Sequence, residues 1–181
     1  GDFSRRAMIQ RMNGDLANDL GNLSQRVLSM IFKNCSSVMP ALPATAAPED
    51  SALLDAADAM LGKVRAHMDV QSFHEGLRCI WEVVSDANKY VDTTAPWGLK
   101  KTDPVRMGEV LAVLAETIRQ AAILVQPVMP GSASKILDQL GVAEDLRAFD
   151  MLAGAGRIAA GVEIRKPEPV FPRFVEEEGK G

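Results

Sequence analysis

Apolar residues recur every three or four positions along most of the chain, which is the period of an amphipathic α-helix. The first long stripe predicts a helix over about residues 16–31, with the members Leu16, Leu20, Leu23, Val27, Met30 and Ile31. A shorter helix with Ser4 as its N-cap is expected before it. We place a joint between the two at residues 13–15, because glycine weakens a helix and Asn and Asp favour caps.

The same period predicts three further long helices and one short helix, over about residues 49–68, 70–91, 103–126 and 132–140. Residues 92–102 are expected to break the pattern between two of them. Thr102 or Asp103 can cap the helix that follows, since Pro104 then occupies the first helical position. Gly141 stands where a left-handed C-terminal cap is expected.

The helical pattern ends after Gly141, and the rest of the chain is rich in small residues, prolines and glutamates. We expect a short helix near residues 146–152 and short strands around 162–164. The predicted fold class is all-α, a bundle of about five helices with a largely extended C-terminal tail. The predicted domains are the bundle, residues 1–143, and a C-terminal extension, residues 144–181.

Composition supports an ordinary globular chain of 181 residues, with 47% hydrophobic and 24% charged residues. These values exclude intrinsic disorder, and no run of about 18 apolar residues predicts a membrane span. Two cysteines are too few for a disulfide framework, and no signal peptide is recognised, so we expect a cytoplasmic protein. The first residue is not Met, which indicates a fragment or a processed chain.

The net charge of −4 argues against a partner bound by bulk positive charge, such as a long nucleic acid. The charge is unevenly spread, however. Residues 1–35 carry five basic and three acidic side chains, and residues 97–107 carry three basic and one acidic. The mildly basic segments are therefore the first helix and the break around residue 100.

No catalytic or metal site is predicted in this chain. The glycines of Gly154-Ala155-Gly156 follow no predicted strand, so they indicate a turn and not a phosphate loop. His67 and His74 are seven residues apart and complete no ligand set of three or four. With only two histidines there is no Ser–His–acid triad either. A helical chain without a reaction centre favours a binding function.

Asn22 and Arg26 lie four residues apart beside the apolar stripe of the first long helix, so their side chains share one patch. Asn donates and accepts hydrogen bonds, and Arg donates from a planar fork that also stacks. The alternative is a solvated flank, with Arg26 paired to Asp19 or to another helix.

Two further positions do not fit the helical pattern. Asn88 falls inside an apolar stripe, where its amide needs a hydrogen bond, and such a bond can tie the helix end to the following loop. Trp97 follows Pro96, which stiffens the approach and is expected to keep Ala95 extended. The ring is then either a flat stacking surface or a plug over the end of the bundle.

These positions and their surroundings resemble the anticodon-binding domain of methionyl-tRNA synthetase. The matching stretches are Arg11-Met12-Asn13-Gly14-Asp15-Leu16-Ala17-Asn18-Asp19-Leu20-Gly21-Asn22-Leu23-Ser24-Gln25-Arg26, Ala87-Asn88-Lys89-Tyr90, Ala95-Pro96-Trp97, Gln126-Pro127-Val128-Met129-Pro130 with Gln139-Leu140-Gly141, and Pro169-Val170-Phe171-Pro172-Arg173. The resemblance covers nearly the whole chain.

The resemblance implies that Trp97 stacks on the first anticodon base, a cytosine, while Pro96 holds its loop. It implies that Asn22 and Arg26 hydrogen-bond to unstacked bases of the CAU anticodon of methionine tRNA. Asn13, Asp15 and Asn88 also match the family motifs, and we expect them to order the backbone.

In the family a separate catalytic domain of the same chain charges the tRNA with methionine, using ATP and Mg²⁺. Its signature motifs and zinc-binding cysteines are absent here, so this chain is expected to need neither cofactor nor metal. We expect the extension to pack partly on that domain, through residues such as Val170, Phe171 and Phe174. Two alternatives stay open: the same bundle from a sister synthetase, or a helical protein–protein docking module.

Overall fold

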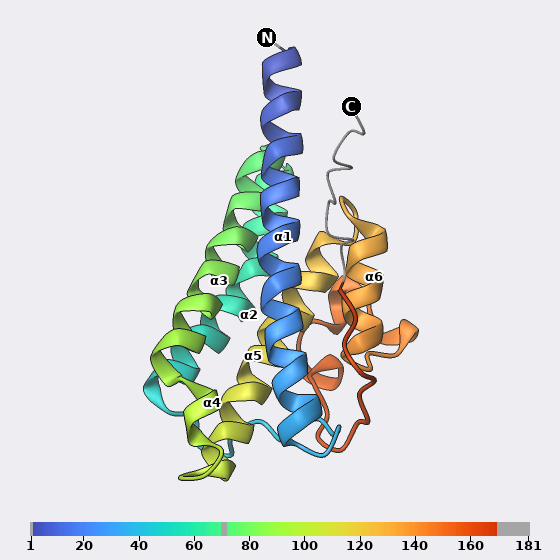
Figure 1. Cartoon of the computed structure of the whole chain (residues 1–181). Coiled ribbons are helices and arrows are strands. Elements are labelled where there is room, and N and C mark those ends of the chain that lie inside the picture. Colours follow the sequence, from blue (N-terminus) through green and yellow to red (C-terminus); the bar gives the residue numbers. More distant parts are fainter. Residues whose placement is uncertain (1, 70–71, 170–181) are drawn as a thin grey trace, which may run out of the picture.

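One helix, α5 (Pro104–Val125), forms the centre of the fold because almost all of its residues are buried. The computed structural model describes residues 2–69 and 72–169 (Figure 1). The helices around α5 are α1 (Asp2–Asn34), α2 (Pro48–Asp69), α3 (Phe73–Thr94), α4 (Pro96–Leu99) and α6 (Pro130–Gln139). All five contact α5, which confirms the predicted all-α bundle. No helix in the described part of the chain is both long and apolar enough to cross a bilayer.

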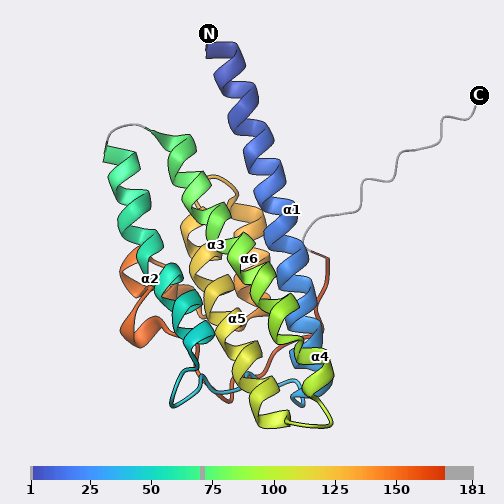
Figure 2. The ribbon, with the colours of Figure 1, turned by 90° about the vertical axis from the view of Figure 1, so that its left-hand side faces the viewer.

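The first helix is continuous, so the joint predicted at residues 13–15 is wrong. A single glycine costs a helix only about 1 kcal/mol relative to alanine, and Gly14 has open space around it. Ile9 and Met12, on the N-terminal side of the expected joint, pack against the same core as Leu16. The N-terminal turns of α1 extend beyond the other helices (Figures 1 and 2).

The chain after α6 forms three 3₁₀ turns, Glu144–Leu146, Phe149–Met151 and Gly154–Gly156. They replace the short helix predicted near residues 146–152, and the last confirms a turn at the glycines. A single bridge between Val38 and Glu163 replaces the expected strands. Leu152 and Ile164 are buried in the core of the bundle. The contacts predicted for Val170, Phe171 and Phe174 lie outside the described residues.

A buried charged network fixes this segment to α5. Arg119, with a fully buried side chain, donates to both carboxylate oxygens of Glu116 at 2.8 and 2.9 Å. It also donates to the carbonyl oxygens of Met151 at 3.0 Å and Leu152 at 2.5 Å. The backbone N–H of Ile158 donates to Glu116 at 2.9 Å. Two buried charges are therefore satisfied jointly by each other and by the C-terminal segment.

Two helix caps occur where the sequence predicts them. Asp103 accepts a hydrogen bond from the backbone N–H of Arg106 at 3.1 Å, with Pro104 at the first helical position of α5. Gly141 has φ of 74°, and its N–H donates to the carbonyl oxygen of Asp138 after α6. The left-handed backbone and the close approach of Val162 both require glycine at this position.

Replacing Gly141 with alanine is expected to lower the free energy of unfolding by about 1–3 kcal/mol. The new Cβ would lie 2.6 Å from Cγ1 of Val162, and the left-handed backbone would be strained as well. Urea denaturation monitored by circular dichroism measures the change. Gly131→Ala is the matched control, since nothing lies within 4 Å of its Cβ position. Equal effects of the two substitutions would contradict the steric explanation.

Candidate functional site

Asn22 and Arg26 both lie exposed on α1, one turn apart, as the spacing predicts. Nη2 of Arg26 lies 3.7 Å from Oδ1 of Asp92 in the last turns of α3. Asp19 instead accepts a hydrogen bond from Nε1 of Trp81 at 2.5 Å. The Arg26 guanidinium therefore pairs with another helix and not with Asp19, and this contact places its patch beside the end of α3.

Asn88 forms its hydrogen bond inside α3. Its Nδ2 donates to the carbonyl oxygen of Val84 at 3.2 Å, one turn earlier in the same helix. The prediction that it ties the helix end to the following loop is wrong, because the carbonyl one turn back is within easy reach of a helical Asn side chain. Asn88 is half-buried and orders the backbone only locally.

The corner between α3 and α4 is a single residue, Ala95. Its φ of 45° and ψ of 60° are left-handed, so the prediction of an extended Ala95 is wrong. Its N–H donates to the carbonyl oxygen of Val91 at 2.9 Å, which closes α3, and Pro96 then begins α4. A left-handed conformation costs a non-glycine residue about 1–2 kcal/mol, and the closing bond and the burial of Pro96 offset that cost.

Trp97 lies on the single turn of α4, with 54% of its surface exposed. More than half of its surface is therefore accessible to a ligand. Asp92, which pairs with Arg26, stands five residues before Trp97 in the chain. Figures 1 and 2 show α4 at the end of the bundle where α3 ends and α5 begins, opposite the N-terminus of α1. The ion pair with Asp92 therefore places Arg26, with Asn22 one turn earlier on α1, beside the last turns of α3, from which Pro96 and Trp97 follow in the chain.

The other two predicted motif residues lie farther along α1. Asp15 precedes Asn22 by seven residues, which is about 10 Å along a helix axis, and Asn13 is farther still. Asp15 is exposed, whereas Asn13 is half-buried. The structure does not bring either residue to the patch of Asn22 and Arg26.

A carboxylate that the sequence did not single out as a site residue lies behind this end of the bundle. Asp50, in the first turn of α2, is fully buried and accepts from Tyr90 Oη at 2.6 Å. Arg106 donates to both of its oxygens, at 2.7 and 2.9 Å, and the N–H of Ala47 donates at 3.1 Å. Asp50, Tyr90 and Arg106 are called the clamp below.

Burial alone would raise the pKa of Asp50, but the hydrogen bonds from Arg106, Tyr90 and Ala47 outweigh it and lower that pKa. The same environment raises the pKa of Tyr90, first through burial and then through its bond to Asp50. The carboxylate is thus ionised and the phenol neutral at pH 7. Tyr90 belongs to a matched motif and Arg106 to a basic segment, but only the fold reveals the partner they share.

The clamp also changes the charge of this end. Arg106 is neutralised by Asp50 and lies within 3.3 Å of Glu49 and Glu109 as well. Lys100 and Lys101 are exposed. Among the residues that the structure describes they form no ion pair, so they supply the positive charge next to Trp97 in the segment 97–107.

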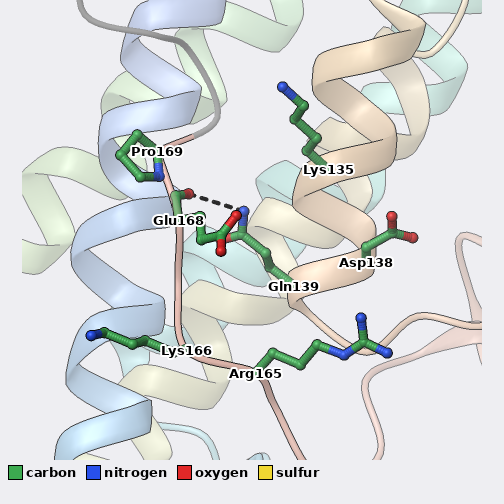
Figure 3. A pocket seen from close by; sticks show the side chains of 7 residues that line it. All are labelled: Lys135, Asp138, Gln139, Arg165, Lys166, Glu168 and Pro169. Carbon is green, nitrogen blue, oxygen red and sulfur yellow. Dashed lines mark hydrogen bonds between the residues drawn. The ribbon is translucent and has the colours of Figure 1, made fainter.

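A separate cleft of about 270 Å³ lies between α6 and residues 165–169 (Figure 3). Its cations Lys135, Arg165 and Lys166 point in different directions, and Asp138 and Glu168 stand among them. The cleft contains none of the predicted site residues, and its mixed charges do not converge on one ligand. Nowhere in residues 2–69 and 72–169 do three histidine, cysteine or carboxylate side chains gather as a metal site.

Comparison with known proteins gives a consistent result. Residues 40–181 match the family model for the anticodon binding domain of methionyl tRNA ligase. The methionine–tRNA ligase of Brucella suis is 50% identical over 177 residues, which cover 97% of this chain and 34% of that protein. That of Mycobacterium leprae is 45% identical over 185 residues, covering 100% of this chain and 34% of that protein. The chain thus spans about a third of the length of these relatives.

Solved structures show the same relationship. Methionyl-tRNA synthetase of Mycobacterium tuberculosis in its free state has a TM-score of 0.85 and 44% identity, covering 94% of this chain and 34% of that chain. The same enzyme bound by methionyl-adenylate has a TM-score of 0.84 at 44% identity, covering 92% of this chain and 33% of that chain. The arrangement of helices around α5 is therefore that of a known domain. Because the family model covers well over half of its residues, the chain belongs to the family of anticodon-binding domains of methionyl-tRNA ligase.

Proposed function

We propose that this chain recognises the CAU anticodon of methionine tRNA. The observation that carries the proposal is the exposed Trp97 ring, held on a fixed corner at the end of the bundle where Asn22 and Arg26 lie. Sequence-specific RNA recognition favours unstacked loop bases that stack on aromatic rings and present their edges to polar side chains. Family membership and this arrangement point to the same ligand.

Each residue has one task in this proposal. Trp97 stacks on the first anticodon base, a cytosine, and Pro96 holds the turn that presents the ring. Asn22 donates to and accepts from the edges of the splayed bases, and Arg26 donates to them. The backbone of α1 and α3 is ordered by the remaining motif residues, Asn13, Asp15 and Asn88, which do not contact RNA.

The ion pair between Arg26 and Asp92 is compatible with this role. Its atoms are 3.7 Å apart, and the side chains are 46% and 72% exposed. Exposed pairs of this kind contribute about 0–1 kcal/mol. The guanidinium can therefore exchange the carboxylate for a base at small cost, and Lys100 and Lys101 add positive charge nearby.

The protein of which this chain is part would use ATP and Mg²⁺ to charge the tRNA with methionine in the cytoplasm. The relative from M. tuberculosis binds methionyl-adenylate, the activated form of methionine. The reaction belongs to a catalytic domain elsewhere in that protein, while the bundle, residues 1–143, contributes recognition. The extension, residues 144–181, would pack in part on that catalytic domain.

Titration with anticodon stem-loops tests the proposal. Binding of the 181-residue chain to a loop carrying CAU is expected to be at least about tenfold tighter than to loops with one anticodon base changed. Fluorescence anisotropy of labelled stem-loops measures both affinities. Equal binding to all loops would contradict recognition of CAU. No binding to any loop would favour a protein–protein docking module.

A further inference from the structure

The segment that carries Trp97 is bracketed by two residues that bind the same carboxylate. Tyr90 lies in the last turns of α3 and Arg106 in the first turn of α5, and both donate to Asp50. Asp50 belongs to neither helix, since it is in the first turn of α2. One buried side chain thus joins the two helix ends between which α4 is suspended.

Short hydrogen bonds link the clamp to the corner on both sides. On the α3 side, Thr94 Oγ1 donates to the carbonyl oxygen of Tyr90 at 2.6 Å, and Ala95 follows directly. On the α5 side, the side chain of Asp103 accepts from the N–H of Arg106, and its own N–H donates to Leu99 at 2.8 Å. Thr94 thus links the residue before Ala95 to Tyr90, and Asp103 links the last residue of α4 to Arg106.

Apart from the clamp, the corner is held by the packing of α4 on α5, with Pro96 buried and Leu99 against the core. The helix α4 comprises four residues, and a single turn is not stable by its own hydrogen bonds. Trp97 is 54% exposed, so its own packing fixes it only in part. Ala95 adds a strained left-handed backbone that relaxes unless its neighbours are held. The ends of the segment therefore contribute to the orientation of the ring.

We propose that Asp50 is a positioning residue for Trp97, and that the clamp sets the orientation in which the ring meets an anticodon base. This inference rests on the proposed function, because it assigns to Asp50, Tyr90 and Arg106 a part in RNA affinity that they exert without touching RNA. The clamp holds the Trp97 ring in its binding orientation before RNA binds, so that little conformational entropy is lost when the complex forms.

Two substitutions weaken the clamp by different amounts. Tyr90→Phe removes one hydroxyl and leaves the bidentate contact between Arg106 and Asp50. Asp50→Asn replaces an ionised acceptor with an amide, which cannot accept all four hydrogen bonds. It also leaves Arg106 with only Glu49 and Glu109, which are more exposed than Asp50, as charge partners. Asp58→Asn is the matched control on the same helix, about 12 Å along its axis. It removes a carboxylate that binds Gln120 and Arg157, at 2.9 and 2.7 Å, away from the corner.

The experiment uses the 181-residue chain with ¹⁵N-labelled tryptophan. It records the indole N–H signals of Trp81 and Trp97 without RNA, assigned with Trp97→Phe, and then the affinity for the CAU stem-loop well below each melting temperature. Tyr90→Phe and Asp50→Asn are expected to shift or broaden the Trp97 signal and to weaken binding about 3-fold and about tenfold. Asp58→Asn is expected to lower the melting temperature while the Trp97 signal and the affinity stay as in the unsubstituted chain.

The results separate the inference from the function on which it rests. A clamp variant that is folded, with an unchanged Trp97 signal and unchanged affinity, would overturn the positioning role. So would Asp58→Asn if it shifted the signal as much as Asp50→Asn. If Asp50→Asn does not fold, Tyr90→Phe decides. If the unsubstituted chain binds no stem-loop, the proposed function fails, and the indole signal still decides whether the clamp positions the ring.

Discussion

Trp97→Ala is expected to weaken binding of the CAU stem-loop by about 1–3 kcal/mol, which is about 5- to 150-fold. The substitution removes the flat surface on which a base stacks and leaves the rest of the site in place. Because the ring is 54% exposed, the melting temperature should change little. Anisotropy titration and thermal denaturation of the same samples measure the two effects separately.

Trp97→Phe is the control for this prediction, since phenylalanine keeps an aromatic face. It should retain much of the affinity that alanine loses. A fall in stability with unchanged affinity in Trp97→Ala would show instead that the ring serves the fold, and it would remove the main support for RNA binding.

Arg119→Met is expected to lower the free energy of unfolding by about 3–5 kcal/mol. Both side chains are fully buried, and the substitution leaves the Glu116 carboxylate with only the partly exposed Arg157, 3.8 Å away, as a charge partner. The carbonyl oxygens of Met151 and Leu152 lose their donor at the same time. Urea denaturation measures the loss, which is a large part of the 5–15 kcal/mol typical of a domain.

In Arg119→Met, residues 149–158 should detach from α5 before the rest of the bundle unfolds. The amide of Ile158 donates to Glu116, so its hydrogen exchange reports on the network directly. Adding Glu116→Gln to Arg119→Met removes the negative charge with which Arg119 was paired. The double variant should therefore recover part of the lost stability. A loss below about 1 kcal/mol in Arg119→Met would contradict the view that this network fixes residues 149–158 to α5.

Most of the helices can be predicted from the sequence, because the spacing of the apolar residues and the positions of proline and glycine indicate the same helix ends. The stripes, Pro104 and Gly141 place the ends of α2, α3, α5 and α6 within a few residues of those observed, whereas α1 continues through the joint expected at residues 13–15. The exceptions are positions where packing or helix closure outweighs the conformational preference of the residue itself. Gly14 is tolerated because the helix packs on both sides of it, and Ala95 turns left-handed because α3 closes there.

The C-terminal segment was harder to predict because its contacts are distant in sequence. The helical period shows that Glu116 and Arg119 share a face, but it does not show that residues 151–158 cover it. The sequence after residue 141 has no strong period, and its buried residues, Leu152 and Ile164, stand alone. Only their packing on the bundle identifies them as core.

The exposed residues of the candidate site could be predicted from the sequence, but the buried residues behind them could not. Asn22, Arg26 and Trp97 stand out because they break or flank the stripes. Asp50 stands in a first helical turn, where an acid is expected on account of the helix dipole alone. Its partners are 40 and 56 residues away, so its role depends on the tertiary fold.

The central claim is that Trp97 stacks on the first anticodon base, and a double-mutant cycle tests it most directly. Affinities are measured for the unsubstituted chain and for Trp97→Ala, each with a CAU stem-loop and with one whose first anticodon nucleotide lacks its base. We expect removal of the base to weaken binding to the unsubstituted chain by about tenfold and to change binding to Trp97→Ala little. Two losses that simply add would show that ring and base do not meet, and would contradict the claim.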